Sequence, residues 1–158
     1  MASSSSSPQW KHSVFLNFRG EDTRNNFVSH LYKALDRYGI DTFKDDVTLQ
    51  RGQHISLGLL KAIEGSRFAI VVISENYGFS GWCLDELVKI MDCMDSMGQT
   101  VIPIFYRVDP CDVENQSGTF AQAFSQHQKS YKDNMLVQSW RDALAKVASI
   151  SGWDSRHW

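Results

Sequence analysis

The chain has 158 residues, a length that predicts one domain with a single hydrophobic core. Hydrophobic residues make up 42% of the chain and charged residues 22%, which is typical of a soluble globular protein and unlike a disordered or membrane-spanning chain. The net charge of −2 gives no electrostatic reason to expect nucleic acid or an anionic membrane as the main partner.

The cysteines favour a reducing compartment. Cys83, Cys93 and Cys111 are an odd set without a CxxC pair, which fits neither a disulfide framework nor a zinc site. No stretch is long and apolar enough for a transmembrane helix, and the N-terminus lacks the apolar region of a signal peptide. Residues 1–11 contain a serine run and are expected to be a flexible leader, with the folded domain at 12–158.

Apolar runs and helical periods alternate along the first half of the chain. The run HSVFLNF at 12–18 predicts a buried strand that ends before Arg19-Gly20. A helix is expected from Asp22 or Thr23 to Gly39, a short strand within 40–46, and a helix from Ser56. The run RFAIVVIS at 67–74 is apolar and β-branched almost throughout, which indicates a central strand covered on both faces.

The second half continues the same alternation. A buried strand is predicted in TVIPIFYRV at 100–108, closed by Asp109-Pro110, with helices at 117–132 and 136–151 and an edge strand from 152. Strands that alternate with helices indicate an α/β fold, in which a parallel five-stranded sheet carries helices on both faces. Ligands of such sheets bind outside the carboxyl ends of the strands, so the loops after Phe18, Phe43, Ser74 and Phe105 are candidate sites.

Residues 81–90, GWCLDELVKI, predict an amphipathic helix that begins at this edge of the sheet. The apolar stripe consists of Leu84, Leu87, Val88 and Met91, spaced as on one helix face. On the same helical wheel Glu86 points away from the stripe. The simplest interpretation is an exposed acid near the helix start, which only the context can overturn.

The loops exclude several common chemistries. The sequence contains neither GxGxxG nor GxxxxGK[ST], so a dinucleotide in the Rossmann manner is not expected. The third strand ends in Ser74-Glu75-Asn76, which does not suit a phospho-receiver, and no histidine is positioned for a nucleophile triad.

What remains is a cleft-facing helix start with Trp82, Cys83 and Glu86, opposite Arg19-Gly20 and the loop that contains Asp45. A carboxylate in such a place can stabilise the positive charge that develops on a ribose when an N-glycosidic bond is cleaved. Trp82 is either a stacking surface for a base or a core anchor, and the pattern leaves both open.

Seven motifs, in this order, resemble those of one family. They are VFLNFRGEDTR at 14–24, SHLYKAL at 29–35, GIDTFKDD at 39–46, LQRGQHIS at 49–56, LLKAIEGSRFAIVVIS at 59–74, NYGFSGWCLDELVKI at 76–90 and VIPIFYRVDPCDVENQSGTFAQAF at 101–124. The chain thereby resembles the TIR (Toll/interleukin receptor) domains at the N-terminus of plant intracellular immune receptors. Domains of this family usually continue into one further helix, which this chain is expected to lack.

The resemblance implies a flavodoxin-like fold and an NAD+ nucleosidase, a hydrolase that cleaves the nicotinamide–ribose bond of NAD+. The expected products are ADP-ribose and cyclic ADP-ribose-type signals of plant immunity and cell death. NAD+ is then the substrate, with NADP+ left open, and no cofactor or metal is expected. Glu86 matches the catalytic glutamate, Asp85 is interpreted as a helix-start acid, and Phe18, Arg19, Gly20 and Trp82 match the substrate pocket.

The resemblance also implies self-association. Ser29 and His30 match a first-helix interface, and Arg51-Gly52 lies in the loop that gates the pocket and reaches a neighbouring subunit. We therefore expect a homo-oligomer that is more active than the isolated domain, located in the cytoplasm, with the nucleus left open. The alternative is a non-catalytic scaffold that signals only by contact between TIR domains.

Overall fold

A computed structural model describes residues 10–23, 27–44 and 57–157 and contains one parallel sheet of five strands in the order β2-β1-β3-β4-β5. The strands are β1 (His12–Phe18), β2 (Thr42–Lys44), β3 (Ser66–Ile73), β4 (Thr100–Phe105) and β5 (Trp153–Asp154). The helices are α1 (Gly20–Thr23), α2 (Phe27–Arg37), α3 (Leu57–Glu64), α4 (Gly81–Met97), α5 (Pro110–Asn115), α6 (Thr119–Ser130) and α7 (Asn134–Ala148), with short turns η2 (Tyr77–Phe79) and η3 (Ser155–His157). The predicted α/β architecture is confirmed.

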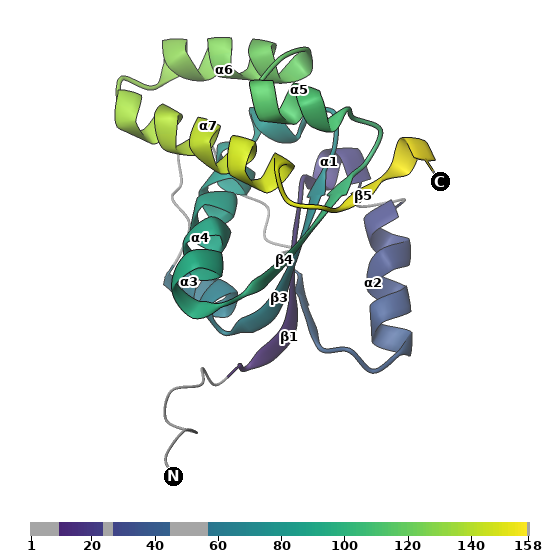
Figure 1. Ribbon diagram of the computed structural model, residues 1–158. Coiled ribbons are helices and arrows are strands. Elements are labelled where there is room, and N and C mark those ends of the chain that lie inside the picture. The colour runs from purple at the N-terminus through teal and green to yellow at the C-terminus, as the bar shows by residue number, and fades with distance from the viewer. Residues whose placement is uncertain (1–9, 24–26, 45–56, 158) are drawn as a thin grey trace.

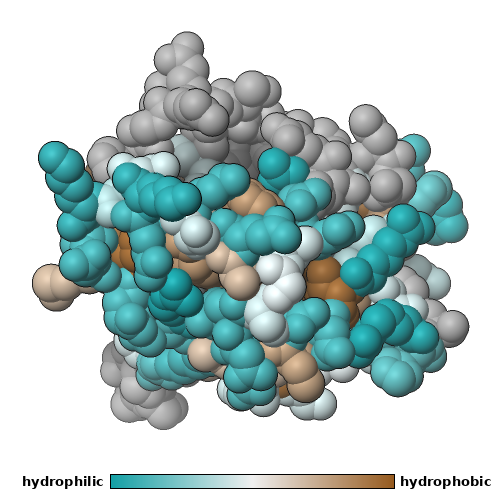
Figure 2. Space-filling view, turned by 90° about the horizontal axis from the view of Figure 1, so that it is seen from above, coloured by the Kyte–Doolittle hydropathy of each residue, from teal (hydrophilic) through white to brown (hydrophobic). Residues whose placement is uncertain are grey.

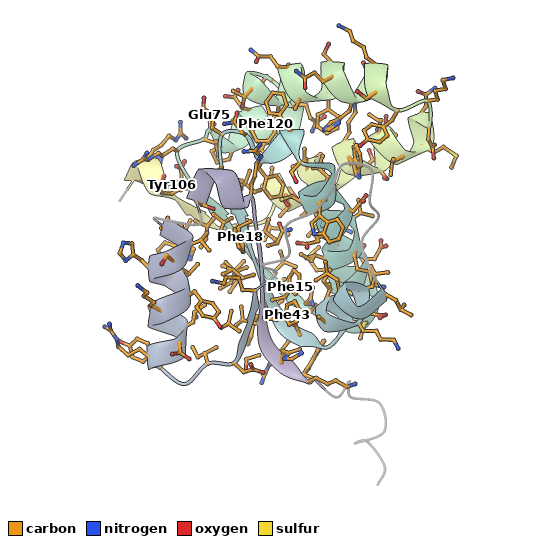
Figure 3. All side chains as sticks on the ribbon, turned by 180° about the vertical axis from the view of Figure 1, so that it is seen from behind. Phe15, Phe18, Phe43, Glu75, Tyr106 and Phe120 are labelled. Carbon is orange, nitrogen blue, oxygen red and sulfur yellow. The ribbon has the colours of Figure 1, made fainter. Side chains whose placement is uncertain are left out.

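Helices cover both faces of the sheet (Figure 1). The two faces separate because successive side chains of a strand point to opposite sides. Phe15, Ala69 and Val71 belong to the core on the side of α3 and α4, whereas Leu16 and Ile70 belong to the core under α2. Figure 3 shows Phe15 beside Phe43 of β2, and the two rings stack with their centroids 5.6 Å apart.

Helix α4 is buried on more than one side. Its N-cap is Ser80, whose hydroxyl accepts from the backbone N–H of Cys83, and it ends at Gly98, whose positive φ of 74° suits glycine. The helix packs against the sheet, α3 and α7. Its buried side chains are Cys83, Leu84, Glu86, Leu87, Ile90, Met91 and Cys93. The interpretation of Glu86 as an exposed residue off the buried face is therefore wrong, because α7 and the sheet cover α4 from different directions.

Several predicted boundaries shift. Helix α1 begins at Gly20, before the expected Asp22 or Thr23, and β2 occupies only the middle of the expected 40–46 segment. Ser56, the expected cap of the next helix, lies outside the described residues. Helix α5 was not expected. Its N-cap Asp109 accepts a hydrogen bond of 2.9 Å from the backbone N–H of Cys111, and Pro110 occupies the first turn.

Candidate active site

The candidate site lies where the ends of β1 and β3 meet the start of α4. The turn η2 connects β3 to α4 along the chain, and its residue Tyr77 contacts Asn17 of β1. Seen from above, onto the end of the molecule at which the strands finish, the described surface is mostly hydrophilic, with apolar residues in small separate spots (Figure 2). Polar side chains that include Asn17 and Glu86 are buried beneath this surface.

Glu86 is the acid of this group. Its side chain is only 3% exposed. Its Oε1 accepts a hydrogen bond of 2.8 Å from Nδ2 of Asn17, and its Oε2 accepts one of 2.9 Å from Nε1 of Trp82. A buried carboxylate is costly unless donors replace water, and these two N–H groups meet that need from β1 and from the preceding turn of α4.

Asn17 and Tyr77 form the layer behind Glu86. Both side chains are fully buried, and the hydroxyl of Tyr77 donates to Oδ1 of Asn17. Burial, followed by the nearby Cys83 and Glu86, raises the pKa of Tyr77 well above its ordinary value. The phenol therefore keeps its proton and acts as a donor.

The turn that holds Tyr77 packs without space for a side chain at the next residue. A Cβ added at Gly78 would lie 2.7 Å from Cδ1 of Phe120, a residue of α6 that Figure 3 places near the loop after β3. The carbonyl of Gly78 also receives a hydrogen bond of 2.7 Å from Nε2 of His127. Helix α6 thus fixes η2 and, with it, the position of Tyr77.

Cys83 joins the start of α4 to the end of β1. Its thiol is buried, and Sγ lies 3.3 Å from the carbonyl oxygen of Phe18. Its own carbonyl lies 3.2 Å from the Tyr77 hydroxyl and 3.4 Å from Nδ2 of Asn17. Cys83 therefore belongs to the same cluster as Glu86.

The loop after β1 meets this cluster through its backbone. The side chain of Phe18 packs in the core on the α2 side, so it is the Phe18 carbonyl that contacts Cys83. Arg19 and Gly20 are half-buried, and the Arg19 carbonyl accepts a 3.0 Å hydrogen bond from the hydroxyl of Thr23. The predicted substrate-binding residues Phe18, Arg19, Gly20, Trp82 and Cys83 thus occupy one end of the sheet.

Asp85, next to the acid of the cluster, has a different role from the one expected. It lies beyond the first turn of α4, so it is not a helix-start acid. Its Oδ1 accepts a hydrogen bond of 3.0 Å from Nε1 of Trp140 in α7. Asp85 therefore fixes the packing of α7 on α4, while its neighbour Glu86 points into the cluster with Asn17.

The remaining predicted residues are elsewhere. Asp45, Arg51 and Gly52 lie outside the described residues. Ser29 is half-buried and His30 is exposed on α2, which covers the opposite face of the sheet from α4, so neither joins the Glu86 cluster (Figure 1).

Sequence reasoning missed Asn17 and Tyr77. A signal for Asn17 was present, since it is a polar residue inside the apolar run HSVFLNF, and a buried polar side chain needs a partner. Nothing comparable marks Tyr77.

Within residues 10–23, 27–44 and 57–157, no three acids, histidines or cysteines are grouped to hold a metal. None of the helices in those ranges is long and apolar enough to cross a membrane.

Together these observations define a flavodoxin-like α/β domain with an acid-centred cluster at the carboxyl ends of its strands. The chain belongs to the TIR domain family, whose model matches residues 11–158.

Its relatives are plant disease resistance proteins. The chain is 58% identical over 153 residues to "TMV resistance protein N" of Nicotiana glutinosa and 53% identical over 156 residues to "Disease resistance protein RPV1" of Vitis rotundifolia. Each match covers 96% of this chain but only 13% and 11%, respectively, of the relatives, so the chain spans a small part of their length.

A solved structure shares the fold. The TIR domains in the structure of the activated Roq1 resistosome, which directly recognises the pathogen effector XopQ, are 51% identical to this chain with a TM-score of 0.85. The match covers 92% of this chain and 89% of that one. The resemblance stated from the motifs is confirmed at the level of family and fold.

Proposed function

We propose that this domain is an NAD+ nucleosidase, with Glu86 as the catalytic residue, and that its products are signals in plant immunity and cell death. NAD+ is the substrate in this proposal, with NADP+ as an alternative dinucleotide, and no cofactor or metal takes part. The observation that supports it most is the Glu86 carboxylate, buried among hydrogen-bond donors at the carboxyl ends of the strands. A domain that only adheres to other copies needs no buried acid at this position.

The chemistry follows from the charge of the acid. As the bond between nicotinamide and C1′ of the ribose breaks, its electron pair leaves with the nicotinamide, and positive charge develops on the ribose. A fixed carboxylate stabilises that charge, most strongly where water is excluded. Water then adds to C1′ and releases a proton, which gives ADP-ribose, and attack by a group of the same nucleotide gives the cyclic product.

The neighbouring residues have proposed roles in binding. Trp82, which is half-buried with its indole N–H on Glu86, borders the nucleotide, and Cys83 with the Phe18-Arg19-Gly20 loop forms the wall across from it. Asp45 is proposed as a further contact from the loop after β2.

A second function, assembly, is favoured by the similarity to the TIR domains of the Roq1 resistosome. We propose that copies of this domain associate through Ser29 and His30 of α2 and through Arg51 and Gly52, and that assembly raises nicotinamide release. The free state of the three cysteines fits a reducing compartment, and we place the protein in the cytoplasm, with the nucleus as an alternative site.

The test is the release of nicotinamide from NAD+ by the purified domain over a series of protein concentrations. Glu86→Gln is the matched variant, because alanine would leave a cavity and two donors without an acceptor. We expect the variant to lose at least about 100-fold in rate, as when one stabilising group of a developing charge is removed. The rate per wild-type protomer should rise with concentration. Equal, measurable rates for wild type and Glu86→Gln would reject Glu86 as the catalytic residue. No release by the wild type at any concentration would reject the enzyme in favour of the scaffold.

A further inference from the structure

The side-chain amide of Asn17 has only one orientation that satisfies its surroundings. The Tyr77 hydroxyl donates to Oδ1 of Asn17, which lies nearer to it than its other acceptor, the carbonyl of Cys83 at 3.2 Å. The two hydrogens on Nδ2 then face Oε1 of Glu86 at 2.8 Å and the carbonyl of Cys83 at 3.4 Å. Turned by half a rotation, the amide would set its oxygen against two acceptors, which is unfavourable in a buried site.

The donors to Glu86 come from different parts of the fold. Trp82 belongs to α4 itself, four residues before Glu86, so it moves with the carboxylate when the helix moves. Asn17 belongs to β1, which is paired on both sides within the sheet. Of these two donors, the Asn17 amide is therefore the one that fixes the carboxylate relative to the sheet and to the loop after Phe18.

From this geometry we propose that Asn17 and Tyr77 are positioning residues for catalysis: Tyr77 sets the orientation of the Asn17 amide, and Asn17 aims the Glu86 carboxylate at the ribose. This inference rests on the proposed role of Glu86. Three elements, β1, η2 and α4, then hold one acid, and the hydrogen bonds run from a phenol through an amide to the carboxylate.

Tyr77 is suited to orienting the Asn17 amide because its phenol stays protonated and therefore acts as a hydrogen-bond donor to Oδ1. Burial and the charge of Glu86 keep the pKa of the phenol raised, so that it donates throughout the pH range in which a carboxylate works. A serine at this position would not reach as far, and a phenylalanine fills the same space without the donor. Tyr77→Phe therefore tests the orientation of the amide with little change of shape.

The experiment compares the kinetics of nicotinamide release by Asn17→Leu and Tyr77→Phe. We expect kcat of Asn17→Leu to fall by up to about 100-fold, the loss typical of a misplaced catalytic group, with KM for NAD+ within about threefold. The acidic limb of its pH profile should move to higher pH, because a carboxylate that loses a donor binds its proton more tightly. Tyr77→Phe should lose about fivefold, the value of one neutral hydrogen bond.

Gln99→Leu is the matched control, since Gln99 is another buried amide and its Nε2 donates to the backbone carbonyls of Ile63 and Ser66. Its kcat should stay within about twofold of wild type, because only stability is affected. Wild-type kcat in folded Asn17→Leu, or an equal loss in Gln99→Leu, would overturn the inference. If Asn17→Leu does not fold, the kcat of Tyr77→Phe decides: a wild-type value, or a loss no larger than that of Gln99→Leu, would overturn the inference.

A second measurement separates this inference from the proposed function. In nitrogen-15 spectra of the wild-type domain, the side-chain NH2 signals of Asn17 should shift as Glu86 titrates, and Glu86→Gln should abolish that shift. Tyr77→Phe should displace the same signals. If the wild type releases no nicotinamide, the proposed enzyme function fails, but these spectra still report whether Asn17 positions Glu86. If Tyr77→Phe leaves the Asn17 signals unchanged, the positioning role of Tyr77 is refuted.

Discussion

Two buried carboxamides, one at each end of the sheet, are used differently. At the amino end, Gln99 donates from Nε2 to the carbonyls of Ile63 and Ser66 at 2.8 and 2.9 Å. Its Oε1 is buried and has no hydrogen-bond partner among the described residues. At the carboxyl end, Asn17 uses both its oxygen, which accepts from the Tyr77 hydroxyl, and its nitrogen, which donates to the side chain of Glu86.

The difference separates a polar group that serves the fold from one that serves a site. Any sequence with this backbone leaves carbonyls at the end of α3 and the start of β3, so Gln99 satisfies a need that the fold creates. No fold requires a buried carboxylate, so Asn17 and Tyr77 satisfy a need that Glu86 creates. Stability should therefore depend more on the amino end, and activity more on the carboxyl end.

Among residues outside the Glu86 cluster, the largest effect on stability should come from Gln99→Leu. The change leaves two buried carbonyls without their donor, and we expect the free energy of unfolding to fall by about 2 kcal/mol. Urea denaturation measures it. A loss below about 0.5 kcal/mol would mean that water or relaxation replaces the amide, and the comparison between the two ends would fail.

Asp85→Ala should have the next largest effect and tests whether the carboxyl end also contains acids that serve only the fold. The change removes the acceptor of the Trp140 indole, and we expect a loss of about 1 kcal/mol. Asp85→Asn keeps an oxygen at the same place and should lose less. Thermal unfolding gives both values. Nicotinamide release per folded protomer should not change in either variant, and a selective loss of activity would contradict the assignment of Asp85 to packing.

The smallest effect should be a dependence of stability on pH through His127. Burial first, and then the positive charge of Arg141, lower the pKa of His127, although its hydrogen bond to Gly78 opposes them. The folded state therefore binds this proton less readily than the unfolded chain, whose pKa is about 6.5. The stabilisation is complete above that value and decreases as pH falls through it toward the lower pKa of the folded state. Denaturation midpoints between neutral and mildly acidic pH should follow this slope, and His127→Gln should flatten it.

The sequence predicts the elements that have length and a clear pattern. Strands β1, β3 and β4 are recognisable from apolar runs, and α4 from its stripe. Helix α5 is too short and too polar for a helical period, so only its Asp109-Pro110 start was visible, and that pair was interpreted as the end of a strand. The helical wheel predicted an exposed Glu86 because a single apolar stripe implies only one buried face. Helix α4 is in fact covered by both the sheet and α7.

The candidate site was predicted in part for a similar reason. The loops at the carboxyl ends follow from the order of elements, and five of the residues matched by the motifs lie there: Phe18, Arg19, Gly20, Trp82 and Glu86. The partners of Glu86 depend on which strands become neighbours and on where η2 places its phenol. Asn17 and Tyr77 are 60 residues apart in the chain, so no local pattern connects them.

The edge strands of the sheet are very short. Its outermost strands, β2 and β5, contain only three and two residues. Within the described residues, these two edges therefore offer few free backbone groups to a strand from another molecule. The assembly proposed above should therefore not grow by the addition of strands to this sheet, and we expect it not to bind dyes that recognise amyloid.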